Sequence, residues 1–179
     1  DPSVRRKLLD GGFTWRHLFT TAFNITSAAA AVHERGYYIG DINESNILIA
    51  PDALITLIDC DSFQVKDNIS GKTYRCLVGK PEYTAPELQG KSYKDVDRTV
   101  ETDSFALAVL IFQLLMEGTH PYQAKGKLVE DAAGTHEKII KGYFPYTCKL
   151  SGIAPPDHAP SFNILHPDMQ RLFHRCFVD

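Results

Sequence analysis

The sequence predicts a mainly α-helical domain that contains one small β-hairpin. Two stretches, 14–35 and 102–117, have the length and the apolar content of buried helices. Between them lie two short apolar runs, 47–49 and 54–58, with turn-forming residues in between. With 179 residues and 44% hydrophobic content, the chain can bury one substantial core, so we expect a single domain over 1–179.

The first helix is expected over residues 14–35. Apolar residues recur at the spacing of one buried helical face, at Leu18, Ala22, Ile25, Ala29 and Val32. Gly36 follows at the place where a helix end favours a residue with positive φ. The helix is therefore expected to end just before Gly36.

The two short apolar runs predict an antiparallel hairpin. Pro51 and Asp52 are typical turn residues, and they separate Ile47-Leu48-Ile49 from the second run at 54–58. Such a hairpin would bring Asn46, which precedes its first strand, close to Asp59, which follows its second strand.

The rest of the chain divides into loops and two further helices. Residues 60–100 are polar and irregular, which predicts a long functional or mobile loop. A central helix is expected over 102–117, with Thr102 or Asp103 as its N-cap and Gly118 after its end. Loops and short helices are expected over the proline-containing stretch 119–160, and a final helix over 167–178, opened by Pro167.

Composition excludes several classes of function. Lys and Arg number 19 against 22 Asp and Glu, a net charge of −3, so no basic excess indicates a nucleic-acid surface. The longest apolar run, 105–116, is too short to span a membrane. The four cysteines form no CxxC pair and show no zinc-type spacing, which favours reduced thiols in a cytoplasmic protein.

Three oxygen-bearing side chains have a spacing that suits phosphate chemistry. Asn46 follows Asp41 by five residues, and Asp59 follows Asn46 by thirteen. If the hairpin forms, all three can lie around one phosphate–magnesium centre, because carboxylate and amide oxygens are suitable ligands for this hard cation. In isolation, Asp41 could equally be a turn residue.

At this point the sequence resembles the C-terminal lobe of a eukaryotic-type protein kinase, in a form similar to bacterial kinase-like proteins. The resemblance rests on five motifs in family order. They are a catalytic loop at 39–46, a metal-Asp motif at 59–61, the end of an activation segment (59–87) at Gly79-Lys80-Pro81-Glu82-Tyr83-Thr84-Ala85-Pro86-Glu87, the start of a central helix at 103–109, and a turn at 118–122.

The resemblance implies a role for each site residue. Asp41 would orient the attacking hydroxyl or accept its proton, and Asn46 and Asp59 would hold Mg²⁺ on the phosphates of ATP. Leu48 would form the floor under the adenine, and it is expected to be a core residue with or without that role. A second register, Asp61-Ser62-Phe63, would make Asp61 the metal ligand or an additional charge beside it. The central helix would brace the catalytic loop through Asp103, unless that residue is only a helix cap.

Two positions depart from the family pattern. Gly40 stands where many kinases have an Arg that docks a phosphate of the activation loop, and Asn43 stands where Ser/Thr kinases have a Lys. Lys80 is hypothesised to supply the cation that position 43 lacks, although a surface loop charge is the competing interpretation. Activity is then expected not to need phosphorylation at Ser62, Ser70, Thr73 or Tyr74.

The resemblance implies an ATP- and Mg²⁺-dependent protein Ser/Thr kinase that acts on protein substrates. No Gly-rich loop or strand Lys precedes the catalytic loop, so the N-terminal lobe is expected to be a partner outside this segment, and the segment alone is expected to be inactive. The alternative is a pseudokinase that binds nucleotide or partners without efficient catalysis. A small-molecule kinase is disfavoured by the stretch 81–87, which shapes a peptide-docking surface in protein kinases.

Overall fold

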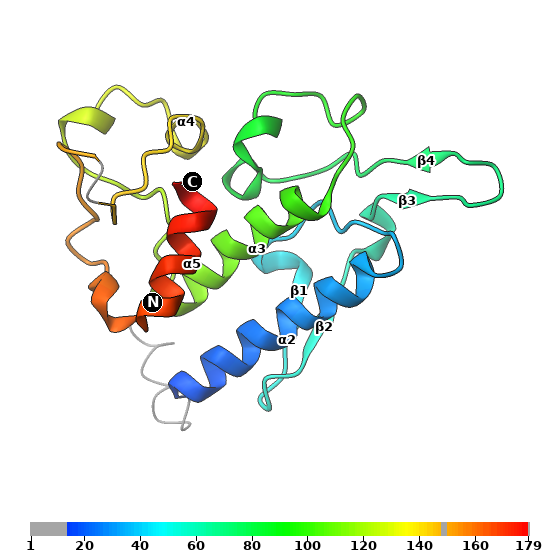
Figure 1. Ribbon diagram of the computed structural model, residues 1–179, viewed down its shortest axis with the longest axis horizontal. Helices are drawn as coiled ribbons and strands as arrows, with labels where there is room; N and C mark the ends of the chain where they lie inside the picture. Colours follow the sequence, from blue (N-terminus) through cyan, green and yellow to red (C-terminus); the bar gives the residue numbers. More distant parts are fainter. Residues whose placement is uncertain (1–13, 148–149, 179) are drawn as a thin grey trace.

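The protein is mostly helical, with two small antiparallel sheets in the part of the chain that the structure describes. This is a computed structural model, and it describes residues 14–147 and 150–178. Helix α3 lies between α2 and α5, and the β1–β2 hairpin packs against α2 (Figure 1). The helices are α2 (Trp15–His33), α3 (Val100–Leu115), α4 (Thr135–Ile140) and α5 (Pro167–Phe177), and the strands are β1 (Ile47–Ile49), β2 (Ile55–Leu57), β3 (Val65–Lys66) and β4 (Thr73–Tyr74).

Helix α2 confirms the predicted helical face. Ala22, Ile25 and Ala29 are buried, and the outer positions of the same face are partly buried and pack on the core. The helix ends as predicted, because Gly36 has a φ of +74° and its amide donates to the carbonyl of His33 at 2.8 Å. This ending turns the chain into the loop that carries Asp41.

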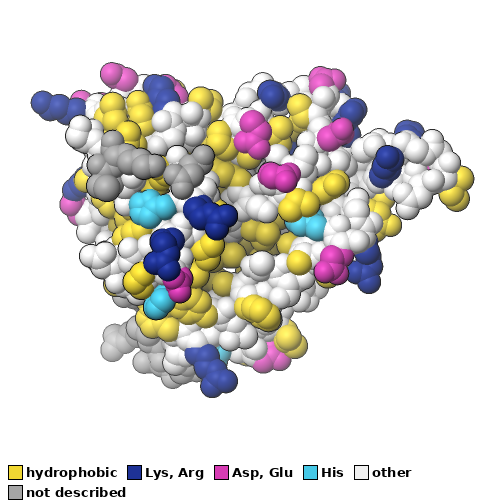
Figure 2. All heavy atoms as spheres, in the orientation of Figure 1, with side chains coloured by type: hydrophobic (Ala, Val, Ile, Leu, Met, Phe, Trp, Pro, Cys, Tyr) yellow, Lys and Arg dark blue, Asp and Glu magenta, His cyan; other side chains and the backbone are white. Residues whose placement is uncertain are grey.

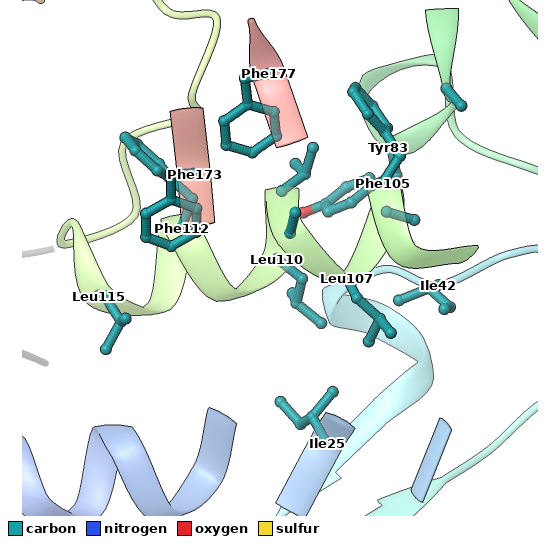
Figure 3. Packing of buried hydrophobic residues seen from close by; sticks show 14 of the residues in the cluster. Ile25, Ile42, Tyr83, Phe105, Leu107, Leu110, Phe112, Leu115, Phe173 and Phe177 are labelled. Atoms are coloured by element: carbon teal, nitrogen blue, oxygen red, sulfur yellow. The ribbon is translucent and has the colours of Figure 1, made fainter. Parts of the chain in front are cut away.

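Helix α3 is the centre of the core. Val109 and Phe112 are 0% exposed, and the Phe112 ring meets those of Phe173 and Phe177 edge to face, with centroids 5.0 and 5.9 Å apart. Figure 3 shows these rings gathered between α3 and α5. Edge-to-face contacts of this kind add to the gain from burying apolar area. Because α2 and α5 both pack against α3, the N-terminal turn of α3 is held rigidly and can support a loop that contacts it.

The predicted N-cap of the central helix is wrong by one turn. The cap is Thr99, whose hydroxyl accepts a hydrogen bond from the Thr102 amide at 3.3 Å, while the Thr102 hydroxyl accepts one from the Thr99 amide at 3.0 Å. Thr102 and Asp103 therefore lie inside the first turn. The carboxylate of Asp103 does not cap the helix and instead contacts another part of the chain.

The first hairpin is confirmed and a second one was not predicted. Strands β1 and β2 pair antiparallel, with Ile47 opposite Leu57 and Ile49 opposite Ile55. Strands β3 and β4 form another two-stranded sheet inside the stretch 60–100 that was expected to be irregular. This second hairpin projects from the body of the protein (Figure 1), so its residues have little core to pack against and carry no strong apolar pattern.

The remaining stretches agree with the expected pattern. Within 119–160 the described residues contain the short helix α4 and a 3₁₀ turn at Lys127–Val129, and α5 begins at Pro167 as predicted. The face shown in Figure 2 has basic and acidic side chains interspersed, without a field of one sign. None of the described helices combines the length and apolar character needed to cross a membrane.

Removing the Phe112 ring is expected to destabilise the protein by about 3–5 kcal/mol, because truncating a buried Phe loses its transfer energy and leaves a cavity. The measurement is chemical unfolding of Phe112→Ala. Phe23→Ala is the matched control, since Phe23 on α2 is 69% exposed and should cost well under half as much. Equal losses for the two variants would contradict the assignment of the core to α3.

Candidate active site

The loop at 39–46 is held by a buried carboxylate of α3. Asp103, 1% exposed, accepts hydrogen bonds from the amides of Ile39 and Gly40 at 2.8 and 2.9 Å. Its second contact outside α3 is with His33, whose Nε2 lies 2.8 Å from the carboxylate. The predicted bracing of the loop by Asp103 is therefore present. Since these bonds reach a charged acceptor away from water, each is stronger than an ordinary backbone bond.

Asp41 is oriented by two side-chain amides. Asn43 Nδ2 donates to Asp41 Oδ1 at 2.9 Å, and Asn46 Nδ2 donates to Asp41 Oδ2 at 3.2 Å. Both amides also donate to the Asp41 carbonyl, each at 3.0 Å. The carboxylate is thus fixed in direction but not neutralised, because neither partner carries a charge. A carboxylate in this state can still accept a proton or a hydroxyl hydrogen bond.

Asn43 lies beneath Asp41, away from the surface. It is 1% exposed, and its Oδ1 accepts from the Ser45 amide at 2.9 Å, which caps the 3₁₀ turn η1 (Glu44–Asn46). The resemblance makes Asn43 a candidate catalytic residue, because Ser/Thr kinases have a Lys here that contacts the transferring phosphate. The geometry instead makes Asn43 a residue that positions Asp41 and the turn after it.

Asn46 and Asp59 meet at one end of the β1–β2 hairpin. The Ile58 amide donates to the Asn46 carbonyl at 3.0 Å, which extends the ladder to the residue before Asp59. Asp59 has a φ of +61°, in the left-handed region that few side chains other than Asn and Asp adopt readily. Strain of this kind often accompanies a functional position. The hairpin therefore brings together the two residues that the sequence singled out as magnesium ligands.

The oxygens at this place suit magnesium. Asn46 uses its amide nitrogen on Asp41, and no hydrogen bond among the described residues occupies its Oδ1. Asp59 and Asp61 are exposed, and Asp61 lies in the 3₁₀ turn η2 (Cys60–Ser62) directly after Asp59. Amide and carboxylate oxygens are ligands that Mg²⁺ accepts, usually together with waters and phosphates. Within the described ranges, no group of His, Cys, Asp and Glu forms a self-sufficient metal cluster.

Lys80 reaches the loop at 39–46, as expected. Its Nζ lies 3.0 Å from Glu44 Oε1 and 2.8 Å from Ser45 Oγ. Partial burial opposes the ionised form of Glu44, but hydrogen bonds from Tyr83 and Lys80 outweigh this effect and lower its pKa. The ion pair is largely open to solvent, so it contributes on the order of 0.2–1 kcal/mol. Lys80 therefore contacts the turn that follows Asp41 in the loop, through Glu44 and Ser45.

Leu48 does not belong to the core. It lies in the middle of β1 and is 55% exposed, which contradicts its description as a core residue. Leu54 in the same hairpin is also exposed, whereas Ile49 follows Leu48 directly in the strand and its side chain points to the opposite face. An exposed apolar side chain at Leu48 is compatible with a position under a planar ring.

Three residues that organise the site could not be assigned a role from the sequence. His33, Gln64 and Arg98 each make hydrogen bonds to residues between 34 and 70 positions away. The only local signal is for His33, which stands in the last turn of α2, where a basic residue suits the helix dipole. Gln64 and Arg98 have no local pattern that would distinguish them from loop residues.

Comparison with known sequences identifies the family. The profile described as "Protein kinase domain" matches residues 5–178, nearly the whole chain. The chain belongs to the protein kinase family. It is 36% identical over 170 residues to Protein kinase YegI of Escherichia coli O157:H7, a match covering 92% of this chain and 26% of that protein.

Further relatives agree with this assignment. Protein kinase YegI of Escherichia coli strain K12 is 36% identical over 169 residues, again covering 92% of this chain and 26% of the relative. The meiosis-specific serine/threonine-protein kinase mek1 of Schizosaccharomyces pombe is 34% identical over 113 residues, covering 58% of this chain and 25% of that protein. This kinase chain thus spans about a quarter of the length of these relatives.

Gly40 of this kinase chain occupies a place that no side chain can share. Its φ is +73°, and a Cβ added there would lie 2.6 Å from both Cβ and Sγ of Cys76. Burial raises the pKa of the Cys76 thiol, so it stays a neutral packing group at physiological pH. An arginine at position 40, as in many kinases, is therefore incompatible with this packing.

Gly40→Ala is expected to lower the free energy of unfolding by roughly 2–4 kcal/mol, because a positive φ costs about 1 kcal/mol and the contact with Cys76 adds overpacking strain. Gly36→Ala is the matched control. Its φ is +74°, nearly the same, but nothing lies within 4 Å of the added Cβ. Denaturant unfolding should show a clearly smaller loss for Gly36→Ala, and a loss as large as that of Gly40→Ala would rule out the steric explanation.

Proposed function

We propose that this chain is the C-terminal catalytic lobe of a protein Ser/Thr kinase that transfers the γ-phosphoryl group of ATP to hydroxyl groups of protein substrates. One observation carries the proposal. The Asp41 carboxylate is directed by Asn43 and Asn46, and Asn46 is joined through the hairpin ladder to the residue before Asp59. A hydroxyl-orienting carboxylate beside a pair of oxygen ligands is what phosphoryl transfer requires.

The chain's own residues would divide the work as follows. Asp41 would accept a hydrogen bond from the attacking hydroxyl, align its oxygen and take up its proton as the new bond forms. Asn46 and Asp59 would hold Mg²⁺, with Asp61 as an additional charge nearby. When bound, Mg²⁺ neutralises charge on the phosphate oxygens. The exposed side chain of Leu48 would lie under the adenine.

Several features support a protein acceptor. A groove of about 400 Å³ lies beside the catalytic loop, between β1 and α3, and it has Glu44 and Tyr83 on its wall. Tyr83 belongs to the segment 81–87, whose Tyr83 and Ala85 are buried against the core. A firmly packed segment at this place offers a surface for a peptide. The relative mek1 carries serine/threonine-protein kinase in its name, which favours Ser and Thr over Tyr as acceptors.

The cellular setting is part of the proposal. The described cysteines, Cys60, Cys76 and Cys176, are unpaired, which suits a reducing compartment such as the cytoplasm; Cys148 lies outside the described residues. The relatives from Escherichia coli suggest a bacterial type of kinase. An N-terminal lobe that covers ATP is expected elsewhere in the full-length protein, and efficient transfer is expected only with that lobe present.

A pseudokinase is the second candidate. Gly40 and Asn43 remove two positive charges that many kinases keep around the catalytic Asp, and this loss favours binding without efficient transfer. Against it, a scaffold would need neither a directed Asp41 nor uncommitted oxygens at Asn46 and Asp59. The two candidates differ in whether phosphate leaves ATP, so a transfer assay separates them.

The test uses the full-length protein with ATP and Mg²⁺, both in a thermal-shift assay and in phosphoryl transfer to casein. Asp59→Asn should abolish the magnesium-dependent part of the thermal shift, because it removes an anionic ligand. Asp41→Asn should keep the shift and reduce kcat by roughly 10²- to 10⁴-fold, the usual contribution of a positioned general base.

The control for this test is Asp52→Asn, at the far turn of the same hairpin. Its side chain accepts a hydrogen bond from the Leu54 amide at 3.1 Å, which an Asn can preserve. Asp52→Asn should behave as wild type. A wild-type protein that shifts with ATP and Mg²⁺ but transfers no phosphate would favour the pseudokinase. One that does neither would refute the kinase proposal and would leave only a pseudokinase that binds partners without nucleotide.

Lys80→Ala is expected to lower kcat by about 10²-fold or more if Lys80 stabilises charge on the transferring phosphate. Glu44→Gln separates this role from the ion pair, because it removes the partner and keeps the cation. Steady-state kinetics should therefore show a severe loss for Lys80→Ala and a small change for Glu44→Gln. Equal losses would mean that Lys80 serves only the Glu44 contact, and no loss in either would leave Lys80 as a surface charge.

A further inference from the structure

Arg98 is a buried cation that has no acidic partner among residues 14–147 and 150–178. It is 3% exposed, no ion pair among the described residues includes it, and its Nε has no hydrogen-bond partner. A guanidinium removed from water is costly unless its charge is compensated. The contacts that Arg98 does make therefore deserve a functional explanation beyond packing.

The Arg98 guanidinium holds the end of the activation segment. Its Nη2 donates to the Val78 carbonyl at 2.8 Å, and its central carbon lies 4.0 Å from the ring centroid of Tyr93, a cation–π contact. The Tyr93 hydroxyl shares a hydrogen bond of 2.9 Å with Thr84 Oγ1, which in turn donates to the Lys80 carbonyl at 2.9 Å. Two backbone carbonyls, of Val78 and Lys80, are thus tied to one network.

The backbone of Arg98 is fixed with respect to the catalytic loop. Gln64, 4% exposed, donates through Nε2 to the Arg98 carbonyl at 3.0 Å and accepts from the Arg98 amide at 2.8 Å. The backbone of Gln64 pairs with that of Tyr38, with bonds of 3.0 and 2.8 Å. Tyr38 directly precedes the loop at 39–46. The backbone of Arg98 is therefore held in a fixed position relative to Asp41.

Two glycines make room for the Arg98 side chain. A Cβ on Gly40 would lie 3.1 Å from Arg98 Cγ, and a Cβ on Gly79 would lie 3.0 Å from Arg98 Nη2. Side chains at either position would push Arg98 out of its place. The stem of Arg98 thus runs beside the catalytic loop and its head group reaches the activation segment, so it bridges the two.

We propose that Arg98 is a positioning residue that holds residues 78–80 against the catalytic loop, and thereby places Lys80, without any phosphate on the activation segment. This inference rests on the proposed kinase function. Where an arginine docks a phosphorylated loop, the contact exists only after modification. The acceptor here is the backbone carbonyl of Val78, which needs no modification. The contact between Arg98 and residues 78–80 therefore exists before any phosphorylation.

The preceding part of the activation segment is also held without phosphate. Strands β3 and β4 pair with each other, and Asp67 closes their turn by accepting hydrogen bonds from the Ile69 amide and the Ser70 hydroxyl. Arg75, after β4, binds Asp97 and the Lys94 carbonyl at 2.7 and 3.1 Å. Neither contact requires an added charge.

The test compares Arg98→Met with Arg75→Met in the full-length protein. Arg98→Met keeps an apolar stem beside Gly40 and removes the bond to Val78. It should lower kcat for transfer to casein by roughly 10²-fold, the cost of a small misplacement of catalytic groups, and change the KM for ATP less than about threefold. Its melting temperature should not fall, since losing an uncompensated buried charge is neutral or stabilising.

Arg75→Met is the control because Arg75 also joins these segments through a backbone carbonyl, but with a side chain that is 39% exposed. It should keep wild-type kcat. Arg98→Gln provides the same comparison if Arg98→Met does not fold. An unchanged kcat in the Arg98 variant, or an equal loss in both arginine variants, would overturn the positioning role.

Phosphate independence is tested separately. The combined variant Ser70→Ala, Thr73→Ala and Tyr74→Phe removes the hydroxyl groups of the β3–β4 hairpin and should keep wild-type kcat; Ser62 is left intact because its hydroxyl donates to the Asp59 carbonyl. A collapse of the rate, or its loss after phosphatase treatment, would show that a phosphate is required.

Amide hydrogen exchange keeps this inference distinct from the proposed function. Peptides covering 76–84 should exchange faster in Arg98→Met than in Arg75→Met, whether or not the protein transfers phosphate. A wild-type protein without transfer would refute the kinase proposal alone. Equal exchange in the two variants would refute the role of Arg98 even in an active kinase.

Discussion

The contact between the Asp103 carboxylate and the loop at 39–46 is the interaction on which the site depends. It joins the amides of Ile39 and Gly40 to the first turn of α3, the helix with the most buried residues of the core. A buried carboxylate that lost these donors would be strongly destabilised, because little water can reach it to solvate its charge. The position of the loop that carries Asp41 therefore depends on the packing of α3. The side-chain amides of Asn43 and Asn46 then orient the Asp41 carboxylate.

The positive charges near this site come from outside the loop at 39–46. The loop itself carries Gly40 and Asn43, neither of them charged, while Lys80 and Arg98 come from the stretch 78–80 and from the stretch before α3. Lys80 contacts the loop through Glu44 and Ser45, and Arg98 holds the backbone on either side of Gly79 through the network with Tyr93. Charge that many kinases place in one loop is here distributed over segments that tertiary contacts bring together.

The elements that could be predicted from the sequence are those with local causes. Helix α2 follows from its apolar spacing and Gly36, and the β1–β2 hairpin follows from two apolar runs around Pro51-Asp52. The β3–β4 hairpin escaped prediction because each strand has two residues and no buried face. The N-cap was misplaced because Thr99 and Thr102 are both suitable cap residues, and in the structure the two form one capping box with Thr99 as the cap. Gln64 and Arg98 act through partners 34 residues apart, which leave no local pattern.

The crowding around Gly40 limits how this site can change in evolution. A side chain at position 40 would meet Cys76 and the stem of Arg98, and a side chain at Gly79 would lie tightly against the head of Arg98 and displace it. Substitutions at these four positions are therefore expected to be epistatic: an arginine cannot be introduced at position 40 alone, because its side chain needs the space that Cys76 and Arg98 occupy. A change that first empties this space also removes the present contact of Arg98 with Val78, so each single step loses an interaction before another can form.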